Sequence, residues 1–203
     1  MRSDIAKAQR ALFGTIGYLA VLLCVYFLHV RFFRVDVVFY SVLFDVVVAT
    51  ALAGLVLAGL GYFSVLGRFE KMQLAVAWLL LGYVYAISVP TVIDRSLSFY
   101  ILEKMQQRGG GIRLDRFEDI FTKEYSREHQ LVAVRLTEQQ ASGTVTIRDG
   151  CVRLTPRGQH LASFSRFFRQ NLLPRHRRLM DRYTDELTNP FSHSEQDSRD
   201  ACR

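Results

Sequence analysis

The sequence lacks the residue patterns by which most enzymes and metal proteins are recognised. Its three cysteines form neither a metal-ligand pair nor a redox motif, and it has no glycine-rich phosphate loop and no nucleophile elbow. The histidines of its second half are scattered. Because acid–base and metal chemistry require several groups brought together, we expect a protein with no catalytic residue, no metal and no cofactor.

Charged residues are scarce between Ala11 and Ile93, where they are confined almost entirely to two short clusters. A hydrocarbon core of ~30 Å requires about 20 consecutive apolar helical residues and tolerates charge poorly. The pattern therefore predicts a transmembrane module over residues 1–95, with spans at about 11–30, 37–66 and 72–93. The second run is long for one perpendicular crossing and short for two, so we expect it to tilt or to extend beyond the bilayer.

Small residues recur in the second span at a spacing of about four, which lets helix backbones approach closely in lipid. They are Ala49, Ala53, Gly54, Ala58 and Gly61. Two interpretations are open: packing among the three helices of this chain, or a seam for a second protein.

Ionisable residues inside or beside the spans form a possible intramembrane or lipid site. Asp45 lies well within the second span, where a carboxylate is costly and commonly faces a partner, an ion or water. It lies near the interface instead if the helix is shifted. Asp94 and Arg95 follow the third span, as a lipid-facing pair or as an ordinary interfacial ion pair.

The basic residues near the spans leave the side of the C-terminal domain open. The chain carries a net charge of +7, mostly from arginine after Arg95. With three crossings, five Lys and Arg lie on the side of the N-terminus and seven on the other. The basic N-terminal tail favours a cytoplasmic N-terminus and an external C-terminal domain.

From Ser96 onward the sequence changes to amphipathic helices separated by turns. Apolar residues at helical spacing predict a first helix ending at Gly109–Gly111, a second around Phe117, and a third that begins at Ser126 and ends before Gly143. The period then becomes two around Asp149-Gly150, which predicts a hairpin with a type I′ turn. Its apolar face is formed by two pairs, Val145 with Leu154 and Ile147 with Val152.

Thr155 and Pro156 predict the start of a fourth helix. Its apolar residues, Leu161, Phe164, Phe167 and Phe168, are expected to face the core. Another helix is predicted over 174–189, and the polar segment 190–203 is expected to be disordered.

Three helices, a hairpin and a helix within residues 96–173 are the layout of a winged helix-turn-helix domain. The segment 143–162, with its string Leu-Thr-Pro-Arg-Gly-Gln-His-Leu-Ala, resembles the wing and following helix of MarR-like and related winged-helix proteins, and 101–110 resembles their first helix. The expected fold class is a mostly α membrane protein, with about three transmembrane helices followed by a small α+β winged-helix-like domain.

In DNA-binding members of that class, the third helix enters the major groove and the wing contacts the backbone or minor groove. The resemblance therefore implies candidate contacts to a partner or to DNA, namely Arg127, His129, Gln130 and Arg135 on the third helix and Arg148 and Arg153 on the hairpin. Glu128 and Glu138 interrupt this set, there is no dense basic stripe, and winged helices also bind proteins.

Our leading hypothesis is a non-catalytic, multi-pass subunit of the bacterial inner membrane whose winged-helix-like domain binds a partner protein, in cell-envelope or exopolysaccharide synthesis or export. The alternative is a membrane-tethered DNA-binding transcriptional regulator, which requires a cytoplasmic domain. A third is a small transporter or lipid-handling enzyme that uses Asp45 or the Asp94–Arg95 pair. The expected partners are membrane lipid and either a membrane protein or a second copy of the chain.

Overall fold

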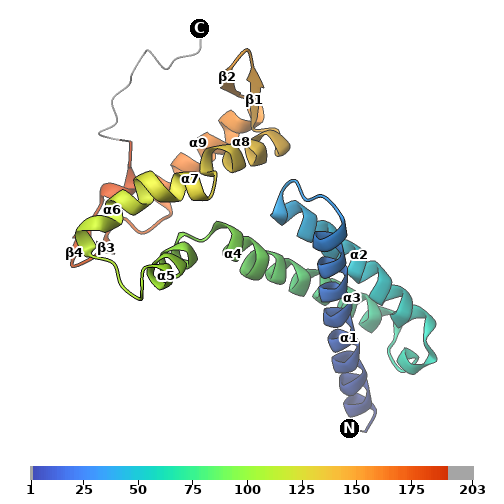
Figure 1. Ribbon diagram of the computed structural model, residues 1–203. Coiled ribbons are helices and arrows are strands. Elements are labelled where there is room, and N and C mark those ends of the chain that lie inside the picture. The colour runs from blue at the N-terminus through green and yellow to red at the C-terminus, as the bar shows by residue number, and fades with distance from the viewer. Residues whose placement is uncertain (1, 192–203) are drawn as a thin grey trace. The chain divides into compact units, whose positions relative to one another are not determined.

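A computed structural model describes residues 2–191 (Figure 1). The chain divides into two compact units, with the boundary between Ile120 and Phe121. We call residues up to Ile120 the membrane unit and those from Phe121 the C-terminal unit. This boundary lies after the one expected from the sequence, at 95–96.

Three long helices lie side by side in the membrane unit (Figure 1), α1 Arg2–Phe32, α2 Val38–Gly59 and α3 Arg68–Ala86. A π turn, Ile87–Thr91, and α4 Val92–Arg95 continue the third helix. The stretches Asp4–Phe32, Val38–Gly59 and Arg68–Arg95 are each long and apolar enough to cross a bilayer. The chain is therefore an integral membrane protein with three candidate spans, as the sequence predicted.

The π turn contains Pro90. Proline has no N–H to donate and its ring crowds the preceding turn, and a wider turn accommodates both without ending the helix.

The second span is shorter than the predicted range 37–66. α2 ends at Gly59, Leu60 is extended, and the chain turns through a 3₁₀ helix, Gly61–Phe63. Phe63 and Leu66 are buried in the same cluster as the helix residues. The last apolar residues of the run therefore form a connection that packs back onto the helices, which neither tilt nor extension of the span would have produced.

The core of the membrane unit is built around Tyr18 and Trp78. Their rings stack with centroids 5.3 Å apart and planes 1° from parallel. Trp78 Nε1 donates to Thr15 Oγ1 at 3.0 Å. A Cβ at Gly82 would collide with the Tyr18 hydroxyl and the Val46 side chain, so the absence of a side chain there lets the three helices meet.

The chain after the spans forms α5 Leu97–Gln107, capped by Ser96. It stops before Gly109 and Gly110, which have φ of 86° and 98°, as the sequence predicted.

The next helical residues run without interruption from Leu114 to Glu128. They comprise 3₁₀ helix Leu114–Arg116, α6 Phe117–Asp119, π helix Ile120–Tyr125 and α7 Ser126–Glu128. Ser126 therefore lies inside this stretch and does not begin the third predicted helix. The break comes at Gln130, whose φ is 44°, and α8 is Leu131–Ala141.

The predicted hairpin is confirmed as β1 Val145–Arg148 and β2 Cys151–Leu154. Val145 pairs with Leu154 and Ile147 with Val152. Asp149 and Gly150 both have positive φ, 51° and 72°, as a type I′ turn requires.

The last helix is α9 Pro156–Asn171, which begins with the predicted cap. Thr155 Oγ1 accepts from Gly158 N at 3.1 Å and donates to Gly143 O at 2.8 Å. A Cβ at Gly158 would collide with the Thr144 carbonyl. Hydrogen bonds and a close backbone contact thus join α8, the hairpin and α9.

The prediction of a helix over residues 174–189 is wrong. This segment contains β3 Arg177–Leu179, β4 Arg182–Thr184 and a 3₁₀ helix, Glu186–Thr188. Met180 has φ of 53°, a left-handed value that turns the chain and lets Leu179 pair with Arg182. The disorder predicted over 190–203 falls, from residue 192, outside the described residues.

Gly82→Ala is expected to destabilise the protein by roughly 1–3 kcal/mol, because the added methyl group overpacks the site between Tyr18 and Val46. Gly54→Ala is the matched control. A Cβ at Gly54 meets nothing within 4 Å, so it is expected to stabilise α2 by a few tenths to ~1 kcal/mol. Thermal unfolding in detergent, followed by helical circular dichroism, is expected to show a lower midpoint for Gly82→Ala and a higher one for Gly54→Ala. Equal midpoint shifts in the two variants would contradict the close packing at Gly82.

Candidate functional site

A histidine and an aspartate on two different spans are hydrogen-bonded in the membrane unit. His29 Nδ1 lies 2.5 Å from Asp45 Oδ1. Asp45 is 1% exposed, whereas His29 is partly exposed. The edges of Phe33 and Phe44 lie around the imidazole, with centroids 5.8 and 6.2 Å from it. The carboxylate therefore lies among the helices of the membrane unit.

The second carboxylate oxygen is the chemically distinctive atom of this pair. Asp45 Oδ2 is buried and has no hydrogen-bond partner in the described part of the chain. A buried ionisable group is costly unless it is paired. Oδ2 therefore remains able to accept a hydrogen bond.

His29 was missed by the sequence reasoning, although its position contained the signal. It lies one turn before the end of α1, and Asp45 lies two turns after the start of α2. The short connection makes the two helices antiparallel neighbours, so residues within about two turns of it on either helix can meet. Within residues 2–191 no three His, Cys, Asp or Glu gather as metal ligands.

The small residues of the second span do not form one seam. Ala49 and Ala53 are buried in the core of the membrane unit. Gly54 is half-buried, and Ala58 and Gly61 are exposed. The glycine that allows the closest approach is Gly82 on α3.

The other residues predicted beside the spans form a local contact. Asp94 Oδ2 lies 4.0 Å from Arg95 Nε in the last turn of α4. Both side chains are partly exposed.

The residues predicted on the third helix are divided by the break at Gln130. Arg127 lies in α7, His129 follows it, and Arg135 alone lies in α8. Arg135 Nη1 donates to Glu138 Oε2 at 2.9 Å. The four residues therefore do not share one helix face, because the left-handed Gln130 redirects the chain.

The basic and the apolar side chains of the hairpin lie on opposite faces. Arg148 lies opposite Cys151 and Arg153 opposite Thr146. Since the pairs alternate between faces, both arginines lie on the face opposite the apolar pairs. These two candidates therefore share a face of the hairpin.

The C-terminal unit exposes the apolar residues of α9 that were expected in its core. Leu161, Phe164, Phe167 and Phe168, which we call the α9 face, are 39% to 60% exposed. Phe164 and Phe168 contact each other, with ring centroids 5.9 Å apart. The prediction that they pack in a core is wrong, because none of the elements in the described part of this unit covers them.

Basic residues surround this face in the sequence. Between Asp149 and Asp181 there are seven arginines and no acidic residue. Arg157, Arg166 and Arg169 lie on α9 itself. The helix thus combines exposed aromatic rings with a positive charge that no acidic residue of this segment neutralises.

No protein-family model matches this chain, and comparison with curated proteins and with solved structures finds no match.

His29→Ala is expected to destabilise the protein by roughly 3 kcal/mol, because Asp45 stays buried without its partner. The double variant His29→Leu/Asp45→Leu is expected to cost less than the single change, since no charge is left in the bundle. Unfolding midpoints in detergent of these variants and of the single variants His29→Leu and Asp45→Leu test the coupling. Independent, additive costs would show that the two side chains do not interact.

Proposed function

We propose that this chain is a non-catalytic membrane docking protein. The three spans anchor it, and the α9 face binds an acidic, apolar surface on a partner protein. The observation that carries the proposal is the exposure of four large apolar side chains on one short helix.

The energetics favour an occupied α9 face. Burying a phenylalanine side chain contributes about 1.5–3 kcal/mol relative to leaving it in water. Exposed apolar clusters of this kind, bordered by polar residues, mark interaction sites more often than isolated surface residues do. Phe164, Phe167 and Phe168 would supply aromatic anchors of the type that dominate binding energy.

The charge of the segment defines the chemistry of the partner. Arg157 lies one turn before Leu161 on the same side of α9. Arginine is enriched at protein interfaces because it pairs with carboxylates in two-pronged geometry. A partner surface with aspartate or glutamate around an apolar centre complements this arrangement.

The order of α8, hairpin and α9 is compatible with a winged-helix-like domain, and such domains serve as protein-interaction modules as well as DNA readers. The setting that we propose is a multiprotein assembly of the bacterial inner membrane, such as one for envelope or exopolysaccharide synthesis or export. Membrane anchoring favours this setting, since it holds the docking surface near other membrane proteins.

DNA recognition is less well supported. A recognition helix presents polar and basic side chains to base edges. In α8 the basic residue is Arg135, which is bonded to Glu138, and the exposed residues include Val132 and Val134. The hairpin arginines alone offer few phosphate contacts.

A second candidate function, proton-coupled transport, is favoured by the buried His29–Asp45 pair. Asp45→Asn keeps the size of the side chain but removes its titration. Under this candidate function the variant would abolish acid-driven proton entry into proteoliposomes containing the purified chain. Equal proton entry for the wild type and Asp45→Asn would rule out proton-coupled transport.

The docking proposal is tested with a photoreactive phenylalanine analogue at position 167 of the full chain in cells. We expect a crosslink to a distinct polypeptide. We also expect Arg157→Glu to reduce its yield roughly tenfold, since losing ~1.4 kcal/mol of charge pairing reduces the affinity tenfold.

The matched control carries the analogue at Tyr183, which is 72% exposed on β4. A crosslink at 183 equal to that at 167 would indicate random collision. Adducts at 167 that contain only lipid, DNA or a second copy of this chain would overturn the partner-protein proposal.

A further inference from the structure

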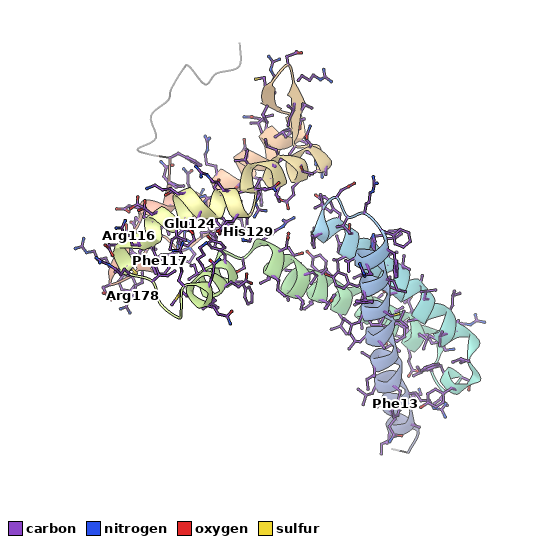
Figure 2. All side chains as sticks on the ribbon, in the orientation of Figure 1. Phe13, Arg116, Phe117, Glu124, His129 and Arg178 are labelled. Atoms are coloured by element: carbon purple, nitrogen blue, oxygen red, sulfur yellow. The ribbon has the colours of Figure 1, made fainter. Side chains whose placement is uncertain are left out.

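The membrane unit has an apolar crevice between its helices, close to the N-terminal half of α1. Its volume is about 300 Å³. Gly17, Val21 and Val56 line it together with Tyr62 and Trp78, and nearly all of its surface is apolar. Phe13, which Figure 2 labels in the N-terminal part of α1, lies at the same crevice.

The crevice is open because Gly17 has no side chain. A Cβ at this position would meet no atom within 4 Å, and the residue is exposed. Val56 and Leu60 beside it are half exposed. On a helix that crosses a bilayer, these residues face hydrocarbon, and an apolar cavity excludes water but accepts an apolar guest. A transmembrane helix, about 10 Å across, is too wide for a crevice of this volume.

The guanidinium of Arg10 lies at the crevice, in contact with Tyr62, one of the lining residues. Arg10 Nη1 donates to the Tyr62 carbonyl at 2.7 Å, and its guanidinium lies 5.0 Å from the centre of the Tyr62 ring. The carbonyl and the ring are both uncharged, so neither contact neutralises the positive charge of Arg10. Lys7, one turn earlier, is instead paired with Glu70 at 2.8 Å.

The depth of Arg10 suits a lipid phosphate. α1 has 31 residues and is therefore ~46 Å long, which exceeds the ~30 Å of bilayer hydrocarbon. Its first residues, which include Arg10, extend to the headgroup level. Arginine binds phosphate through paired hydrogen bonds.

We propose that this crevice binds one acyl chain of an anionic phospholipid, whose phosphate is bound by Arg10. The lipid is a specific ligand that fills the space beside Gly17 and contacts Trp78. This site is separate from the α9 face and does not depend on the proposed docking function.

Trp78 makes the site measurable. It is the only tryptophan of the chain, it lines the crevice, and it is 2% exposed. Bulk lipid therefore has little contact with its ring, whereas bromine on an acyl chain in the crevice quenches its fluorescence. The probe is phosphatidylglycerol with brominated acyl chains, added in increasing proportion to phosphatidylcholine vesicles that contain the full chain.

We expect saturable quenching that unbrominated phosphatidylglycerol reverses. Gly17→Leu fills the crevice and raises the half-saturating lipid fraction roughly tenfold. Arg10→Gln lowers the preference for brominated phosphatidylglycerol over brominated phosphatidylcholine by a similar factor, since it removes a charge-assisted hydrogen bond. Gly54→Leu is the matched control, because Gly54 also has open space around it and does not line the crevice.

Other results overturn the proposal. Quenching that rises linearly and equally for both headgroups, or that is the same in Gly17→Leu and wild type, means that Trp78 meets bulk lipid. Quenching that falls as the density of protein in the vesicles rises means that a second copy covers the crevice. Helical circular dichroism of each variant separates loss of the site from loss of the fold, and the reversal by unbrominated lipid tests the wild-type protein without any substitution.

Discussion

Close packing around Gly82 is the interaction on which the membrane unit depends. Because Gly82 has no side chain, the Tyr18 hydroxyl and the Val46 side chain can lie against it. The Tyr18 ring also stacks on Trp78, which lies one turn before Gly82 on α3. Lipid provides no hydrophobic force between helices, so van der Waals contact of this kind holds them together. The same contacts bring α2 against α1, which places Asp45 beside His29, and they shape the crevice next to Gly17.

The two units solve the problem of apolar surface in different ways. The spans expose large apolar side chains because the bilayer covers them. Their interior contains the stacked rings of Tyr18 and Trp78 and the His29–Asp45 pair. The C-terminal unit has few buried apolar side chains, and the bonds from Thr155 to Gly158 and Gly143 organise its junction. The α9 face therefore remains uncovered within the described residues, which is consistent with a unit that completes its packing on a partner.

Several features followed from the sequence because they rest on local chemistry. Long apolar runs located the three spans, since a bilayer demands them. The register of β1 and β2 followed from Asp149-Gly150, where both residues must accept positive φ, and Thr155-Pro156 located the start of α9. The two glycines after α5 ended it for the same reason. Of the candidate site residues, Asp45 was selected on such chemistry, as an ionisable residue inside an apolar run, whereas the hairpin arginines came from the resemblance to winged-helix proteins.

Other features were decided by contacts between distant residues. α2 ends at Gly59 because Phe63 and Leu66 return to the core, and no local pattern distinguishes such a connection from more helix. The break at Gln130 and the β3–β4 turn at Met180 require left-handed residues that are not glycine, which sequence propensity does not favour. Whether the phenylalanines of α9 are buried depends on what lies opposite them. The sequence by itself determined which segments are apolar and where turns are easy; tertiary structure decided which polar and apolar groups meet, because pairing His29 with Asp45 needs two helices placed against each other.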